Sequence, residues 1–159
     1  MENIQIQKAK LEDLEEIQKL NLMLFEKEKK EYNPNLNLEW TFGEGTNYFK
    51  NSIESNLRLC LIAKYKEKII GYLVGFIFNK NNPCNIFQKQ AELENMFVLE
   101  EYRSKKVGHK LVEEFLDWAR SKNVENVRVT ANTQNVKAIN FYLREGFKDF
   151  SHTLEINLK

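Results

Sequence analysis

Apolar and polar positions recur with two different periods along the chain, and these periods separate expected helices from expected strands. Helical spacing is plainest between Leu11 and Leu24 and again between Val107 and Trp118, where charged residues fill the intervening positions. Continuous apolar runs, or alternation with a period of two, mark the expected strands. The expected helices cover residues 11–31, 48–56, 105–121 and 135–145. The expected strands cover residues 4–7, 59–64, 69–78, 91–98, 127–131, 147–151 and 153–158.

The order of these elements predicts a mixed α/β fold. One strand and two helices come first, a meander of three strands follows, and a strand–helix–strand unit comes after it. The polar residues 65–68 separate two apolar runs and predict a hairpin turn. We find no internal repeat, low-complexity segment or linker, so we expect one domain over residues 1–159.

Composition narrows the function classes. Lys and Arg number 24 against 23 for Asp and Glu, and this near-neutral balance argues against a dedicated nucleic-acid binder. The start of the chain has no apolar stretch long enough for a signal peptide or a membrane span, so a cytoplasmic protein without a membrane partner is expected. Cys60 and Cys84 have no metal-ligand spacing, and we expect no metal site.

The stretch from Glu92 to Gly108 is the first candidate for chemistry. It reads as a strand, a loop with basic residues and the start of an amphipathic helix. A helix N-terminus offers unpaired N–H groups and partial positive charge, which suit phosphate oxygens. Arg103, Lys105 and Lys106 add charge there, and the alternative is a solvated basic turn before an ordinary helix.

The segment from Asn135 to Phe147 is the second candidate. Asn135, Ala138 and Tyr142 share one face of the expected helix, with a small residue between two polar ones. That face could admit a slender ligand and hold an acid at its tip. The alternative makes Asn135 a helix N-cap and Tyr142 a residue at the edge of the core.

Together these two segments resemble the GNAT acetyltransferase superfamily. Its two usual patterns are Arg/Gln-x-x-Gly-x-Gly/Ala at a strand-to-helix turn and Asn-x-x-Ala-x-x-Phe-Tyr-x-x-x-Gly-Phe. This chain matches them over residues 103–108 and 135–147, with Lys106 in place of the first glycine. The element order matches the GNAT fold from end to end. The resemblance implies a strongly twisted, mixed, mostly antiparallel sheet of six to seven strands with helices on both faces.

The resemblance also implies acetyl-CoA as the acetyl donor, with no metal. The Met96 N–H would bond the thioester carbonyl, and Tyr142 would protonate the departing thiolate, a role open to a phenol with a pKa near ~10. The implied CoA-binding residues are Met96, Phe97, Val98, Arg103, Ser104, Lys105, Lys106, Val107, Gly108, Asn135, Ala138 and Tyr142.

Acetyl transfer to an amine needs a base, because a lysine-like amine with a pKa near ~10.4 is mostly protonated at neutral pH. Alternation predicts that Glu92, Glu94, Met96 and Val98 share one face of their strand, with the two carboxylates roughly 7 Å apart. Different GNAT enzymes place a catalytic glutamate at positions that align with Glu92 or Glu94. We favour Glu94, which is nearer the expected thioester; the alternative is that both carboxylates only attract a cationic substrate.

The resemblance leaves the acceptor open. It places residues 26–45 over the acceptor site. The aromatic and acidic side chains there suit a cationic amine, and they are Glu28, Glu31, Tyr32, Glu39, Trp40, Phe42 and Glu44. Lys27, Lys29 and Lys30 in the same segment weaken this argument. A small amine, a polyamine, an aminoglycoside, a lysine side chain and a protein N-terminus all stay open, and we favour a small amine. Homodimerisation also stays open, because many relatives dimerise.

Two other function classes compete with the enzyme. A non-catalytic acetyl-CoA-binding regulatory module is favoured by Lys106 and opposed by the joint presence of Glu92, Glu94 and Tyr142. A nucleic-acid-binding domain using the lysines at 105, 106 and 110 lacks both net charge and a binding motif.

Overall fold

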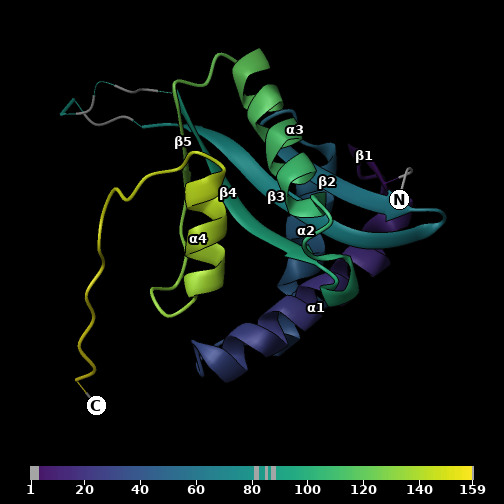
Figure 1. Cartoon of the computed structure of the whole chain (residues 1–159), viewed down its shortest axis with the longest axis horizontal. Coiled ribbons are helices and arrows are strands. Elements are labelled where there is room, and N and C mark those ends of the chain that lie inside the picture. The colour runs from purple at the N-terminus through teal and green to yellow at the C-terminus, as the bar shows by residue number, and fades with distance from the viewer. Residues whose placement is uncertain (1–3, 81–82, 85, 87–88, 159) are drawn as a thin grey trace.

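The centre of the molecule is a twisted sheet of five strands (Figure 1). The computed structural model describes residues 4–80, 83, 84, 86 and 89–158. Its strands lie side by side in chain order: β1 (Ile4–Lys8), β2 (Arg58–Tyr65), β3 (Lys68–Asn79), β4 (Lys89–Val98) and β5 (Asn126–Val129). The first four pair antiparallel, and β5 runs parallel to β4. The sheet is therefore mixed and mostly antiparallel, as the sequence predicts.

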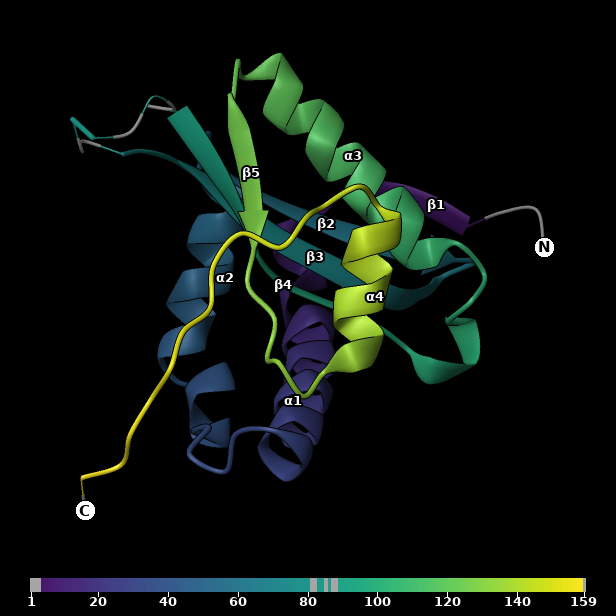
Figure 2. The ribbon, with the colours of Figure 1, turned by 60° about the vertical axis from the view of Figure 1, so that its left-hand side comes forward.

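Helices cover both faces of this sheet (Figure 2). Helices α1 (Leu14–Glu31) and α2 (Glu44–Glu54) pack on one face, and α3 (Val107–Ser121) packs on the other. Helix α4 (Val136–Arg144) stands beside α3. Three short 3-10 turns complete the described elements: η1 (Leu11–Asp13), η2 (Leu38–Thr41) and η3 (Glu100–Tyr102). No helix in the described ranges is long and apolar enough to cross a membrane.

Strands β2 and β3 are continuous apolar runs because helices bury both of their sides. On one side, Tyr72 of β3 is fully buried, and its ring meets Phe49 of α2 edge-on at 6.1 Å. On the other side, the Phe115 ring of α3 lies so near Gly75 that a Cβ there would meet it at 2.5 Å. A glycine at this position lets α3 approach the sheet closely.

The C-terminal segment corrects the predicted strand count. Residues 145–158 are described and form no strand, so the described sheet has five strands where six to seven were expected. Phe150, Leu154, Ile156 and Leu158 are 83% to 94% exposed, and the chain runs away from the body beyond α4 (Figure 1). Alternation of apolar and polar residues indicates which side chains would share a face. A strand forms only if its backbone also pairs with the edge strand of a sheet. The local pattern alone does not specify that edge.

Candidate functional site

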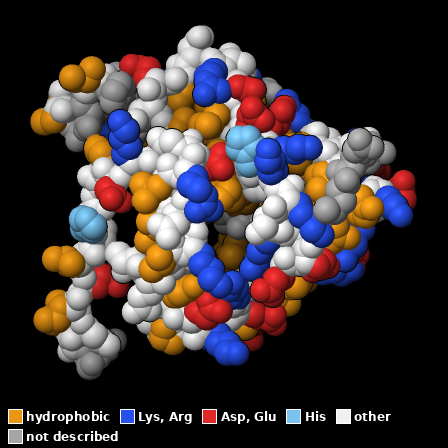
Figure 3. All heavy atoms as spheres, viewed as in Figure 1, with side chains coloured by type: hydrophobic (Ala, Val, Ile, Leu, Met, Phe, Trp, Pro, Cys, Tyr) orange, Lys and Arg blue, Asp and Glu red, His pale blue; other side chains and the backbone are white. Residues whose placement is uncertain are grey.

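A cavity opens where β4 and β5 part. The two strands pair only between Gln90–Leu93 and Asn126–Val129, so among the described residues no strand lies beside the rest of that edge of β4. A cavity of about 360 Å³ lies there, lined by Leu24, Phe25, Glu28, Trp40, Tyr48, Glu94, Asn95, Met96, Val129, Thr130, Ala131, Asn132, Asn135, Ala138 and Tyr142. Figure 3 shows the molecular surface hollowed beside α4, with charged side chains around the hollow. The cavity is of the size that binds small ligands.

A β-bulge in β4 shapes one wall of this cavity. Val74 of β3 pairs with Asn95 and Gly75 pairs with Leu93, so Glu94 is the extra residue of the bulge. Glu94 and Asn95 consequently both reach Tyr48 of α2. The predicted alternation is therefore wrong beyond Glu94.

The bulge reverses the face that the following residues present. Pairing puts Phe97 opposite Tyr72, on the side of α1 and α2. Met96 faces α3 instead, where its methyl would lie 3.8 Å from a Cβ added at Gly108. Met96 and Val98 thus do not share a face with Glu92, because one unpaired residue shifts the period by one position.

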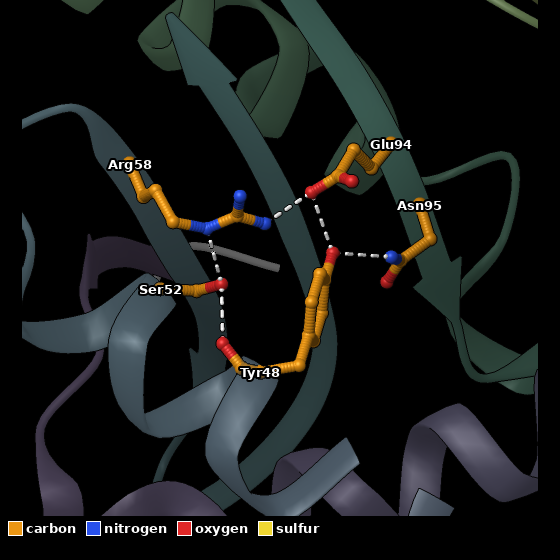
Figure 4. Close-up of polar contacts among 5 residues, drawn as sticks. All are labelled: Tyr48, Ser52, Arg58, Glu94 and Asn95. Atoms are coloured by element: carbon orange, nitrogen blue, oxygen red, sulfur yellow. Dashed lines mark hydrogen bonds and ion pairs between the residues drawn. The ribbon is translucent and has the colours of Figure 1, made fainter. Parts of the chain in front are cut away.

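Glu94 takes part in a polar network that joins α2, β2 and β4 (Figure 4). The Tyr48 hydroxyl donates to Glu94 Oε2 at 2.7 Å, and the Arg58 guanidinium forms an ion pair with the same oxygen. Asn95 Nδ2 donates to the Tyr48 hydroxyl at 3.0 Å. Burial, and then the Glu94 carboxylate, raise the pKa of Tyr48, so this phenol keeps its proton and remains a donor.

Further contacts hold Arg58 in place. Its Nε donates to Ser52 Oγ at 2.9 Å, and the Ser52 hydroxyl donates to the Tyr48 carbonyl at 2.8 Å. The guanidinium also lies over the Tyr48 ring, 4.8 Å from its centroid. The charge of Glu94 is thus balanced by a cation that several groups fix.

Glu92, the other predicted base, lies elsewhere. It is not among the residues that line the cavity, and its Oε2 is 2.6 Å from Nη2 of Arg128 on β5. The Arg128 Nε also donates to it at 2.8 Å. Of the two predicted glutamates, the structure places only Glu94 at the cavity.

The turn before α3 is strained at the position where the family pattern has a glycine. Lys106 is the N-cap of α3 with φ 61°, and Ser104 has φ 60°, both in the left-handed region that favours glycine. Arg103 anchors the turn to β4: its Nε donates to the Val98 carbonyl at 2.9 Å, and its guanidinium lies over the Phe97 ring. Arg103 thus orients the loop towards the end of β4.

Helix α4 forms the opposite wall. The Asn135 side chain accepts from the Ala138 N–H at 3.1 Å, so Asn135 is the N-cap of α4 and also lines the cavity. Tyr142, two turns further on, packs edge-on against Phe141 and Phe147. Burial raises the pKa of the Tyr142 phenol, and the Glu28 carboxylate raises it further, so this phenol keeps its proton at neutral pH.

A contact between α3 and α4 sets the position of that wall. A Cβ at Gly108 would meet the Phe141 ring at 3.2 Å, so the glycine lets α4 pack tightly on the start of α3. His109 Nδ1 of α3 lies 2.7 Å from Oε2 of Glu145, the C-cap residue of α4.

Several lining residues could not be identified from the sequence. Tyr48, Asn95 and the loop residues 130–132 line the cavity, and Arg58 supports it, yet none belongs to a motif. Of the segment expected over the acceptor site, Glu28 and Trp40 line the cavity. The only sequence signal for Arg58 is a charged residue at the head of an apolar run, which is too common to predict a site.

Known proteins with a similar sequence include N-acetyltransferases. An uncharacterized N-acetyltransferase of Archaeoglobus fulgidus is 29% identical over 104 residues, which are 64% of this chain and 68% of that protein. A spermidine N(1)-acetyltransferase of Thermoplasma acidophilum is 30% identical over 95 residues, 60% of this chain but only 54% of that protein.

The fold agrees with a solved structure and with a family profile. The crystal structure of a predicted acetyltransferase with acetyl-CoA from Clostridium acetobutylicum superposes with a TM-score of 0.77 at 20% identity, over 98% of this chain and 97% of that one. The profile of the Acetyltransferase (GNAT) family matches residues 14–147. This match spans most of the chain, which therefore belongs to the GNAT family, as its two motifs predict.

Proposed function

We propose that this chain transfers the acetyl group of acetyl-CoA to an amine by direct attack in a ternary complex. One observation carries the proposal: the Glu94 carboxylate and the Tyr142 phenol line the same cavity, beside the open edge of β4. A carboxylate can accept the proton of an attacking amine, and a phenol can donate a proton to a leaving thiolate. The cavity would hold both reacting groups between them.

The start of α3 suits the donor. Its first turn carries backbone N–H groups, and Lys106 supplies no side-chain cap to them. These groups and the nearby Lys105 and Lys106 ammonium groups would hold the pyrophosphate of acetyl-CoA. The unpaired edge of β4 near Met96 offers backbone groups to the pantetheine arm and the thioester carbonyl.

The proposed chemistry is a single acyl transfer. The neutral amine nitrogen attacks the thioester carbonyl carbon, so that a C–N bond forms and the C–S bond breaks. The nitrogen loses a proton to Glu94 and the CoA thiolate gains one from Tyr142. Glu94 has an oxygen for this role, since the Tyr48 and Arg58 contacts both use Oε2 and the described residues offer no partner to Oε1.

The acceptor is proposed to be a primary amine. Two carboxylates, Glu28 and Glu94, face the cavity, and negative charge attracts amines, which are cationic in solution. One relative is named for acetylating spermidine, which agrees with such an acceptor.

The test is release of CoA thiol from acetyl-CoA with a panel of primary amines, comparing wild type with Tyr142→Phe. We expect turnover with at least one amine, and a kcat lower by about ten-fold or more in the variant, because the phenol proton is lost. The KM for acetyl-CoA and the melting temperature should stay within error. The matched control is Tyr65→Phe, whose hydroxyl makes no hydrogen bond among the described residues and lies outside the cavity lining.

The ion pair of Glu94 favours a second candidate, a module that binds acetyl-CoA without turnover. Arg58 and Tyr48 both bind Oε2 of Glu94, and these contacts suit a structural role of the carboxylate in the cavity wall as well as a catalytic one. Tight acetyl-CoA binding in calorimetry, with no thiol release on any amine, would establish this module. No CoA binding would refute both functions.

A further inference from the structure

Glu28 of α1 is the carboxylate of the cavity that lacks a counter-charge. It is partly buried, and this burial raises its pKa. Arg58 balances Glu94, whereas Glu28 has no ion pair among the described residues. The described residues that line the cavity include no Lys, Arg or His. A partly desolvated, unpaired carboxylate is costly, and a bound cation would offset that cost.

Asn95 lines the same cavity, and its side chain carries an unsatisfied group behind the cavity wall. Its Oδ1 is the one buried side-chain oxygen or nitrogen without a hydrogen-bond partner in the part of the chain that the structure describes. The network determines this orientation. Tyr48 donates its only proton to Glu94, so it must accept from the amide nitrogen of Asn95, and the amide oxygen has no donor (Figure 4). Buried acceptors of this kind normally have a donor.

Aromatic rings flank Glu28 within the cavity. Phe25 lies one turn before it on α1 and stacks with Trp40 at 5.6 Å between centroids. Both rings line the cavity, and α1 packs against β4, which carries Asn95. Aromatic faces attract ammonium groups, so the surroundings of Glu28 suit a cation with N–H donors.

We propose that Glu28, in the cavity that Asn95 also lines, binds a protonated nitrogen of the acceptor, and that this nitrogen is not the one that is acetylated. The proposal rests on the function proposed above and names the substrate class. A neighbouring carboxylate stabilises the charged form of an ammonium, whose nitrogen then has no lone pair for attack. The attacking nitrogen must be a different, neutral one near Glu94. The acceptor is therefore a compact diamine or polyamine.

A binding experiment tests the subsite without turnover. We would titrate 1,4-diaminobutane and, separately, butylamine into the protein saturated with CoA, and measure heats. We expect the diamine to bind about 10- to 100-fold more tightly than the monoamine, the usual effect of one charged hydrogen-bonded contact. Glu28→Gln should remove this difference, and Glu28→Asp should restore part of it. The matched control Glu26→Gln removes an exposed charge from the same helix and should leave both affinities unchanged.

Three outcomes would overturn the subsite: equal affinity for the two amines, no binding of either, or undiminished diamine binding by a folded Glu28→Gln protein. Thermal melting checks the fold of each variant. Steady-state kinetics then separates the two proposals. Raised KM for the diamine in Glu28→Gln, with the KM for acetyl-CoA unchanged, supports both. Diamine binding that depends on Glu28, without turnover in wild type, supports the subsite and refutes the enzyme.

Discussion

The two ends of the cavity are built in different ways. The proposed donor end comes from the end of β4 and the turn that follows it before α3, together with the single helix α4. The proposed acceptor end combines α1, α2, β2 and the bulge of β4 through side chains that are far apart in sequence. Backbone groups dominate the donor end, whereas a side-chain network dominates the acceptor end. Substitutions should therefore cost more stability at the acceptor end.

The largest effect is expected for Arg58→Met. The Arg58 and Glu94 side chains are 17% and 26% exposed, and removal of the cation leaves a partly buried carboxylate without its partner. We expect a loss of about 2–4 kcal/mol in the free energy of unfolding, measured by urea denaturation. The control Arg120→Met breaks an ion pair whose side chains are 68% and 64% exposed, and should cost less than about 1 kcal/mol. If both variants lost the same free energy of unfolding, the ion pair of Arg58 with Glu94 would contribute no more stability than an exposed one.

Tyr48→Phe should have the next largest effect. The variant keeps the ring but removes the hydroxyl that links Glu94 to Asn95, so the Asn95 amide loses a partner in the cavity wall. We expect a loss of about 1–2 kcal/mol in the same denaturation experiment. Tyr65→Phe serves again as the matched control. A change below the error of the measurement would show that water replaces the hydroxyl without cost.

At the donor end, Lys106→Gly should increase the stability of the protein. The left-handed backbone at Lys106 is strained for a residue with a Cβ, so glycine should stabilise the protein by about 0.5–1 kcal/mol. Lys105 is not among the residues with positive φ, and Lys105→Gly should instead destabilise by about 0.5–1 kcal/mol. Thermal unfolding of both variants shows whether each substitution raises or lowers the stability. The same sign for both would mean that lost charge, and not backbone strain, controls this turn.

The smallest effect concerns the pH dependence of stability. Burial raises the pKa of Glu28 in the folded state above its unfolded value. The protonated form is therefore favoured by folding, and the stability that it contributes is complete below the unfolded pKa and lost as pH rises through the folded pKa. Between these two values, wild type should lose stability with rising pH relative to Glu28→Gln. A constant difference between the two proteins across that window would contradict the desolvation of Glu28.

The sequence predicted the helices and strands at the proposed donor end well because the information for these elements is local. The strand before Arg103, the helix after Lys106 and the N-cap at Asn135 each depend on neighbours within a few residues. Ala138 and Tyr142 then line the cavity at helical spacing from Asn135. Such features follow from period and capping chemistry, and both can be recognised in one chain.

Two predictions were wrong because the structure there depends on tertiary contacts that the local sequence pattern does not show. Alternation assumed an unbroken β4, but the bulge at Glu94 shifted the faces of Met96 and Val98. The alternation in residues 153–158 predicted a strand, but the described segment pairs with no edge. Neither the bulge nor the missing partner leaves a mark in the amino-acid pattern, because both depend on what lies beside the strand.

The sequence by itself therefore determined the family and the mixed sheet with helices on both faces. Only the tertiary structure decided that Glu92 pairs with Arg128 away from the cavity, and that Glu94 lies beside Tyr48 and Arg58. It also decided that Glu28 faces the cavity without a counter-charge. The physical reason is range: hydrogen-bond periodicity and helix capping act over a few residues, whereas the charge balance of a carboxylate depends on every element packed around it.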